Sequence, residues 1–495
     1  MSIQVTASML YDLLQCPYRV KLDSTADVGK RDQVNAFVQM LWEKGSQYER
    51  EVMEGLQKEY LDLSIYALAE KERKTNEAMK AGVPLIYSAR IQYGELLGDP
   101  DLLRYENDGY VAIDIKSGAG LSGTGEDLSK PKKTYGVQLA LYTDILERKD
   151  LSPGRYGYIW DIHGEEVLYD FQNPLGPKTP MSLWDYYLET LTTATLIVTD
   201  KEETRPAYSS GVCKLCYWYS HCMSELEARD DLTLIPELGR SKRDVMSSEI
   251  ATTSDLATLD IAPFIRGKKT VFPGIGPAML SKFSDRAKLI KSDNPQPYFK
   301  TPVEFPNHKT ELFFDIEVDP MRDLCYLHGF IERYNDDISG EKFVYFYAED
   351  TSQEAEKSAF QASYEYMKEH LPCAIYYYSK YERTIYRKLQ QKYPQVCTAL
   401  DIEALFDPAF AIDLYFDVVL KHTEWPTKDY SIKTLARFLG FNWRDIDPSG
   451  AASIEWFDQW VKTNDLAIKD RILKYNEDDC IATRVLLDGL KGLQS

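Results

Sequence analysis

The spacing of apolar positions predicts a set of buried strands separated by helices. Residues 111–115 form a short apolar run with alternating side chains, which is typical of a buried strand. Residues 311–318 predict a second strand, which we expect to pair with residues 325–334 and then 342–347 as an antiparallel meander. Helices are expected from about Ala7, over about residues 33–57, around Gln138 and Tyr142, and after residue 480. This order of elements predicts an α/β protein.

Length and composition favour a chain with several folded domains. Its 495 residues correspond to about two to four domains. The apolar content of 44% can fill several cores, which excludes a disordered protein. The net charge of −20 argues against nonspecific binding of nucleic acid by an overall positive surface, but it does not exclude a local basic patch. The start lacks a secretory pattern and no apolar run reaches the ~20 residues of a membrane span, so we expect a cytoplasmic protein without a membrane partner.

A first group of residues has the chemistry that phosphodiester hydrolysis requires. That reaction needs a divalent metal held by carboxylates, with a cation near the attacking water or the developing charge. Asp101 and Asp114 are candidate ligands, and Lys116 points to the same side of its strand as Asp114. Gln138 and Tyr142 are four residues apart, so on a helix they share one face and are candidates for substrate contact. The alternative is a surface turn, an edge-strand ion pair and an ordinary amphipathic helix.

The order of these short motifs resembles that of the PD-(D/E)xK nucleases of the RecB type, in particular the CRISPR-associated RecB-like exonucleases. The motifs are Gly98-x-x-Asp101, Asp114-x-Lys116 and Gln138-x-x-x-Tyr142. The resemblance implies a restriction-endonuclease-like domain in which Asp101 and Asp114 bind Mg2+ or Mn2+ and Lys116 assists catalysis.

Two further features accompany this group. RecB-type nucleases carry Gly-x-x-x-His or Gly-x-x-x-Glu in an earlier helix, and Gly45 with Glu49 matches that pair. The resemblance therefore implies Glu49 as an additional metal ligand, the alternative being a solvated side chain. A basic loop with Lys130, Lys132 and Lys133 precedes the Gln138 helix. These charges are either placed to meet a phosphate backbone or simply solvated.

The cysteines are distributed unevenly, which suggests a metal site rather than a disulfide framework. Cys213, Cys216 and Cys222 lie within ten residues, and three thiols so close indicate a soft metal. A zinc site would normally show a second pair of cysteines nearby, and none follows. Cys16, beside a proline, matches the N-terminal cysteine of the CRISPR-associated RecB-like nucleases. The resemblance implies a structural four-iron–four-sulfur (4Fe–4S) cluster on these four cysteines, with zinc or no metal as the alternatives.

Between residues 223 and 306 the chain changes character. Residues 272–280 resemble a helix–hairpin–helix, in which a Gly-x-Gly turn opens a helix whose free N–H groups can hold a phosphate. Basic residues flank this turn at Arg266, Lys268, Lys269 and Lys282. A plain helical linker is the alternative. Residues 294–306 are rich in Pro and Asn and predict a boundary.

A second group of acids begins in the strand predicted at residues 311–318. Asp315 and Glu317 emerge on one face of this otherwise apolar strand, where unpaired acids would be costly unless they bind metal. Tyr475 and Asp479, four residues apart, face the same way near the end of the chain. Asp-x-Glu early and Tyr-x-x-x-Asp late resemble the DnaQ-like DEDD exonucleases of the RNase H-like superfold. The resemblance implies four acids holding two metals, with Tyr475 orienting the attacking water.

The acid expected between these motifs departs from the family pattern. The stretch of residues 376–382 follows a predicted strand and starts a helix, and Glu382 stands there where the family usually has Asp. Glu382 is therefore the expected ligand, and Asp413 is a second candidate. An inactive RNase H-like domain kept for binding is the alternative.

The layout as a whole resembles bacterial RecB-like nucleases that join these three blocks. It predicts an iron–sulfur PD-(D/E)xK domain over residues 1–230, a helical linker with a helix–hairpin–helix over 231–305 and an RNase H-like DEDD exonuclease domain over 306–495. DNA ends or single strands are the expected substrate, with RNA as an alternative for the C-terminal site. No Walker-type sequence is present, so any helicase partner would be a separate protein. A different class of answer is a nucleic-acid-binding iron–sulfur protein with degenerate centres.

Overall fold

A computed structural model describes residues 4–122, 130–176, 179–446 and 449–494. Backbone contacts divide the chain into two compact units. The N-terminal unit holds Met1–Pro206 and Gly211–Cys222, and the C-terminal unit holds Ala207–Ser210 and Met223–Ser495. Within the described ranges, none of the helices combines the length and apolar character that crossing a bilayer demands.

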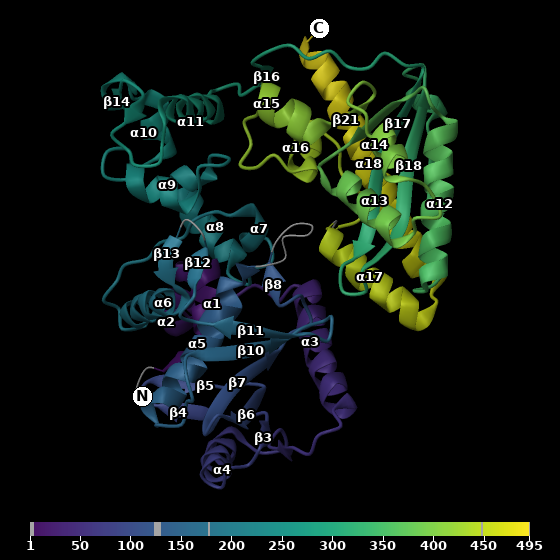
Figure 1. The fold of residues 1–495 in the computed structure, drawn as a ribbon. Helices are drawn as coiled ribbons and strands as arrows, with labels where there is room; N and C mark the ends of the chain where they lie inside the picture. Colours follow the sequence, from purple (N-terminus) through teal and green to yellow (C-terminus); the bar gives the residue numbers. More distant parts are fainter. Residues whose placement is uncertain (1–3, 123–129, 177–178, 447–448, 495) are drawn as a thin grey trace. The chain divides into compact units, whose positions relative to one another are not determined.

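The N-terminal unit is built on a six-stranded sheet with the order β11-β10-β7-β6-β3-β2 (Figure 1). Its strands are β2 (Leu61–Asp62), β3 (Leu85–Tyr87), β6 (Leu102–Glu106), β7 (Gly109–Ile115), β10 (Tyr156–Trp160) and β11 (Glu166–Asp170). A smaller sheet pairs β1 (Val5–Thr6), β5 (Leu96–Gly98) and β4 (Ile91–Tyr93). Every residue of β7 is buried, which confirms the strand predicted from residues 111–115.

Helices pack around this sheet and confirm the predicted periodicity. They include α1 (Ala7–Gln15), α2 (Pro17–Thr25), α3 (Ala36–Gly55), α4 (Leu68–Lys80), α5 (Lys133–Arg148) and α6 (Leu183–Val198). Two later helices, α7 (Ser210–Cys213) and α8 (Tyr219–Ala228), span the boundaries between the two units. Helix α5 is the central one, because residues 139–146 are all buried and it contacts β7, β10, α1 and α6.

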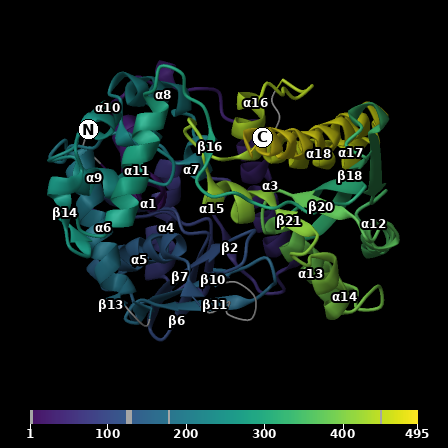
Figure 2. The ribbon, with the colours of Figure 1, turned by 90° about the horizontal axis from the view of Figure 1, so that it is seen from above.

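The C-terminal unit contains a five-stranded sheet with the order β19-β18-β17-β20-β21. Its strands are β17 (Thr310–Asp319), β18 (Leu324–Tyr334), β19 (Lys342–Tyr347), β20 (Ala374–Tyr377) and β21 (Ala411–Asp413). The antiparallel pairing of β17, β18 and β19 confirms the predicted meander. The surrounding helices include α12 (Gln353–Glu369), α13 (Tyr381–Lys392), α14 (Ala399–Leu405), α16 (Ile432–Phe438), α17 (Gly450–Thr463) and α18 (Leu466–Gln494), the last lying along the sheet (Figure 2).

Residues 231–305 form a small helical region within the C-terminal unit. Its elements are α9 (Gly239–Met246), α10 (Thr253–Thr258), the two-stranded pair β14 (Ile265–Arg266) and β15 (Lys269–Thr270), and α11 (Pro277–Ile290). Gly274 has a φ of +77°, a conformation that favours glycine, and α11 begins directly after Gly276. The turn and helix expected at this place are therefore present, and the helix–hairpin–helix assignment stays a prediction.

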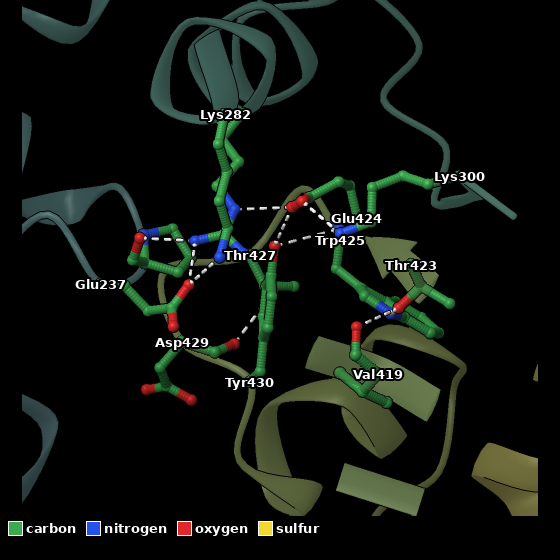
Figure 3. A network of polar contacts seen from close by, with 12 residues as sticks. Glu237, Lys282, Lys300, Val419, Thr423, Glu424, Trp425, Thr427, Asp429 and Tyr430 are labelled. Carbon is green, nitrogen blue, oxygen red and sulfur yellow. Dashed lines mark hydrogen bonds and ion pairs between the residues drawn. The ribbon is translucent and has the colours of Figure 1, made fainter. Parts of the chain in front are cut away.

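A buried ionic network joins this helical region to the rest of the C-terminal unit (Figure 3). Arg286 of α11 is fully buried, and its Nε donates to Glu424 Oε2 at 2.6 Å while its Nη1 donates to Glu237 Oε2 at 2.7 Å. Tyr430 donates to the same Glu424 oxygen at 2.8 Å, and Lys300 pairs with the other oxygen at 2.9 Å. Because breaking a buried ion pair leaves an uncompensated charge, this network holds α11 firmly against β22 (Thr423–Glu424).

Candidate active sites

Strand alternation directs Asp114 toward helix α5. Ala112 of β7 belongs to the hydrophobic core formed with α5, whereas Ile113 and Ile115 pack on the other side with Met53 of α3. Asp114 therefore faces α5, as Ala112 does. Its side chain is 1% exposed, and its Oδ1 has no hydrogen-bond partner among the described residues. A buried carboxylate oxygen without a donor is costly, and a divalent cation would satisfy it.

Asp101 stands beside Asp114. The register of β6 against β7 brings the residue before β6 next to Asp114, and Asp101 Oδ2 accepts a hydrogen bond from the backbone N–H of Ile115 at 2.7 Å. Burial, and then the charge of Asp114, hold the pKa of Asp101 well above its usual range. Asp114 is buried and Asp101 half-buried, and two carboxylates so close repel each other unless a cation lies between them. The pair therefore fits a divalent metal.

Lys116 completes this group as predicted from the strand period. Its Nζ lies 2.9 Å from Asp114 Oδ2, and its backbone N–H donates to the carbonyl of Trp160 in β10 at 2.8 Å. Burial by itself would lower the pKa of Lys116, but the attraction of Asp114 and Asp101 outweighs it and raises that pKa. The side chain is therefore a charged ammonium group fixed at the carboxylates.

Helix α3 brings Glu49 to the same place. Glu49 is half-buried, and its charge contributes to the raised pKa of Asp101 and, after burial, to that of Tyr87. One turn earlier, a Cβ added at Gly45 would lie 3.9 Å from Ser117 Oγ, so the helix passes close to the end of β7. The Gly-x-x-x-Glu pair is therefore oriented toward the acids.

Helix α5 places Gln138 and Tyr142 on the side that faces Asp114. Tyr142 is buried, its hydroxyl donates to the carbonyl of Asp99 at 3.4 Å, and burial followed by the charge of Asp114 raises its pKa. A Cβ at Gly98 would lie 2.5 Å from the Tyr142 ring, so glycine is needed for this ring to fit. Tyr142 thus packs against the segment before Asp101, whereas Gln138, one turn earlier, is half-buried.

In the C-terminal unit, Asp315, Glu317 and Asp479 form a cluster of three carboxylates. Phe313 of β17 packs with apolar residues of α18, and Asp315 and Glu317 follow it on the same face by alternation. Helix α18 crosses this face and carries Asp479. One oxygen from each of the three acids lies within 4.8 Å of the others, and no other such group occurs within the described ranges. These donors fit a hard divalent cation.

Burial and mutual repulsion shift the protonation of this cluster. Burial, followed by the charges of Asp479 and Glu317, holds the pKa of Asp315 well above its usual range. The same two causes, burial and then Asp479, raise the pKa of Glu317 to about 8. Perturbed acids of this kind gather at functional sites, and a bound cation would return them to the charged form.

Of the two candidates for the remaining acid, Glu382 lies nearer to the cluster. Its charge contributes to the raised pKa of Asp315, and burial raises its own pKa to about 8. Asp413 interacts with Glu382, and its Oδ1 accepts from the backbone N–H groups of Tyr415 and Phe416, so this oxygen caps a helical turn. The structure therefore favours Glu382 as the fourth acid, standing outside the group of three.

Sequence reasoning missed Lys433, which lies beside Tyr475 and Asp479. Its Nζ donates to the Tyr475 hydroxyl at 2.7 Å and lies 3.7 Å from Asp479 Oδ1. Trp443 Nε1 donates to the same Asp479 oxygen at 2.8 Å. Lys433 lies in the short helix α16 and Trp443 follows it outside regular structure, and no motif marks either residue, so no spacing in the sequence pointed to them.

Asn476 was missed as well, although it follows Tyr475 directly. It is fully buried, and its Nδ2 donates to Asp315 Oδ2 at 2.8 Å. A Cβ at Gly329 of β18 would lie 1.7 Å from Asn476 Oδ1, so only glycine leaves room for this side chain. Asn476 therefore holds Asp315 in place. The sequence did not predict this contact, because adjacent residues of a helix point in different directions and Asn476 was not expected to share the face of Tyr475.

The four predicted cluster cysteines lie in the N-terminal unit and are all half-buried. The pKa of the Cys216 thiol is raised, chiefly by burial and to a smaller extent by the charge of Cys16. The two segments are joined by Asp23, which accepts from Tyr217 at 2.8 Å and from Trp218 Nε1 at 2.9 Å. None of the chain's eight cysteines, all within the described ranges, forms a disulfide. Soft donors from two adjoining segments fit a metal cluster.

Comparison with known families covers both sites. Residues 10–223 match the model of the PD-(D/E)XK nuclease superfamily, and residues 312–491 match that of the RNase H superfamily. The chain carries one domain of each superfamily. The PD-(D/E)XK match includes the acids of the N-terminal unit, and the RNase H match includes the three-carboxylate cluster. The predicted α/β architecture, with a PD-(D/E)XK domain first and an RNase H-like domain last, is confirmed. No curated protein matches the chain.

Proposed function

We propose that this protein is a metal-dependent nuclease that hydrolyses phosphodiester bonds of DNA, acting on ends or single strands. The observation that carries the proposal is the cluster of Asp315, Glu317 and Asp479, with oxygens within 4.8 Å of one another. Membership of two nuclease superfamilies supports the same reaction class. A binding module gains nothing from buried, mutually repelling carboxylates, because they cost free energy until a cation is bound.

In the PD-(D/E)XK site, Asp101 and Asp114 would hold Mg2+ or Mn2+, with Glu49 as a further ligand. When bound, the ion would polarise the phosphate and lower the pKa of a water molecule. Lys116 stays charged and is fixed at Asp114, so it is placed to stabilise negative charge that develops on the phosphate. Gln138, on the α5 face that Asp114 meets, would contact the substrate.

In the RNase H-like site, the metal ligands would be Asp315, Glu317 and Asp479, with Glu382 as the fourth acid. Tyr475 would stand beside the attacking water. Its hydroxyl accepts a hydrogen bond from Lys433, and burial followed by the charge of Asp479 raises the pKa of the phenol, so the hydroxyl keeps its proton and is held beside the metal ligands. Asn476 keeps Asp315 oriented.

We further assign a 4Fe–4S cluster to Cys16, Cys213, Cys216 and Cys222. Such a cluster, when bound, would tie the N-terminal segment to the end of the PD-(D/E)XK domain. The support is the position of Cys16 next to Cys216 and the half-burial of all four thiols. Iron and sulfide content and the visible spectrum of anaerobically purified protein test the assignment. Stoichiometric zinc without iron would replace it by a zinc site.

The finer features of the RecB-like type follow the same proposal. We propose a division of the chain at residues 1–230, 231–305 and 306–495, with a helix–hairpin–helix in the middle part. A helicase partner would be a separate protein. RNA is the alternative substrate of the C-terminal site. The Gly-x-Gly turn before α11 supports the middle assignment.

A cleavage assay with matched variants tests the function. Wild type, Asp114→Asn and Asp315→Asn would be incubated with end-labelled single- and double-stranded DNA and RNA and Mn2+. Glu77→Gln and Glu477→Gln serve as controls, because these acids pair with Arg73 and Arg444 and belong to neither carboxylate group. Loss of cleavage in one site variant, with both controls active, identifies the working domain.

The competing function is a nucleic-acid-binding iron–sulfur protein with degenerate centres. One observation favours it, namely that Glu382 stands outside the three-carboxylate group. Mn2+ titration separates the two functions, because the nuclease should bind the ion at its carboxylates. Absence of both cleavage and Mn2+ binding in folded wild-type protein would refute the nuclease proposal.

A further inference from the structure

Two lysines share the ring of Tyr135 at the edge of the PD-(D/E)XK site. Lys116 Nζ lies 5.9 Å from the centre of this ring, and Lys132 Nζ lies 5.0 Å from it. Lys116 is the ammonium group already fixed at Asp114. Lys132, the residue before α5, therefore places a second positive charge near the same Tyr135 ring as Lys116.

The charge of Lys132 has no carboxylate partner in the described part of the chain. The acid that acts on it electrostatically is Asp161, but both oxygens of that carboxylate accept from backbone N–H groups, those of Gly120, His163 and Glu165. Burial lowers the pKa of Lys132, which shows that its ammonium group is partly withdrawn from water. A half-buried ammonium group that no described carboxylate neutralises can pair with an anion supplied from outside.

Tyr135 links this cation to the predicted substrate side of α5. Tyr135, Gln138 and Tyr142 follow at intervals of three and four residues, so they lie along one face of the helix. Tyr135 is seven residues before Tyr142, about 10 Å along the helix axis. Burial raises the pKa of the Tyr135 phenol, so at neutral pH it keeps its proton and can donate it to an anion.

We infer that Lys132 and Tyr135 form a binding subsite for the DNA phosphate that neighbours the scissile one. The ammonium group of Lys132 pairs with this phosphate, the Tyr135 hydroxyl donates a hydrogen bond to it, and Lys116 remains with the scissile group. The subsite determines where along the strand the cut falls. It rests on the proposed nuclease function of this domain and adds to it the residues that hold the substrate strand.

The test uses the full chain with the Asp315→Asn substitution, so that the cleavage measured comes from the PD-(D/E)XK site. Steady-state cleavage of a single-stranded oligonucleotide with Mn2+ is followed at several salt concentrations for Lys132→Met, Lys132→Arg and Tyr135→Phe. Lys133→Met is the matched control, since this neighbouring lysine lies over the ring of Tyr186 at 4.8 Å instead. The thermal midpoint of each variant verifies that the domain is folded.

Lys132→Met should raise KM about fivefold at low salt with kcat changed less than twofold, because one phosphate contact is lost from binding. The slope of log KM against log salt should fall by about 0.7, the value for one phosphate contact on a single strand. Lys132→Arg should retain most of the affinity, and Tyr135→Phe should raise KM without changing the slope.

A KM and a salt slope for Lys132→Met equal to those of the parent chain would overturn the subsite while leaving the nuclease intact. A parent that cleaves nothing would instead refute nuclease function in this domain, and the subsite with it.

Discussion

Replacing Asp315 by Asn should stabilise the metal-free C-terminal unit and, at the same time, remove its stabilisation by metal. The three carboxylates lie within 4.8 Å of one another, a distance at which two unit charges repel by about 3.5 kcal/mol at an effective dielectric constant of about 20. At pH 9 Glu317, with a pKa of about 8, is ionised. Asp315, whose pKa is held well above its usual range, there either repels the neighbouring charges or keeps a proton that the unfolded chain has released, and both cost free energy of folding. Replacing Asp315 should therefore gain about 3 kcal/mol after the altered contact with Asn476 is allowed for.

Differential scanning calorimetry of the full chain measures this effect. In EDTA at pH 9, Asp315→Asn should raise the midpoint of one transition by about 5–10 °C. Saturating Mg2+, at about 100 times its Kd, should stabilise that transition in wild type by about 2.7 kcal/mol and leave the variant almost unchanged. At pH 5 the gain in EDTA should shrink, because Asp315 and Glu317 keep their protons there.

Two controls make the experiment decisive. Glu477→Gln removes a charge from the same helix, where it pairs with Arg444, and should produce neither effect. Asp114→Asn should shift the transition of the other unit. If Asp315→Asn lowered the midpoint in EDTA at pH 9, or if Mg2+ stabilised it as much as wild type, the assignment of this cluster as a metal site would be wrong.

Three further predictions concern the supports of the two sites. Gly329→Ala should weaken Mn2+ binding in isothermal titration by about tenfold or more, because its Cβ would lie 1.7 Å from Asn476 Oδ1 and displace that side chain; unchanged affinity would contradict this. Lys116→Met should destabilise the metal-free N-terminal unit by about 3 kcal/mol in thermal unfolding, since it leaves Asp114 buried without its cation, and Mg2+ should restore the loss. Metal-free wild type should lose stability as pH rises from about 4.5 to about 8, because folded Glu317 retains a proton that the unfolded chain releases. Chemical denaturation at a series of pH values in EDTA measures this loss, and Glu317→Gln should remove its share of the slope; an identical slope in that variant would contradict the assignment.

Much of this architecture follows from local sequence alone. Alternation in residues 111–115 and 311–318 determined which side chains share a face, and the structure confirms both strands. Helical spacing likewise placed Tyr475 and Asp479 together on α18. These features depend on the period of one element, so a sequence is sufficient to find them.

Only the tertiary structure decided what meets those faces. Lys433, Trp443 and Gly329 come from segments far along the chain, and their contacts with the RNase H-like site depend on how helices and loops pack on the sheet. The preference for Glu382 over Asp413 likewise rests on which acid packing brings to Asp315. Burial, the cause of most of the pKa shifts at both sites, belongs to the assembled core, because desolvation is produced by all neighbouring segments together and by no single stretch of sequence.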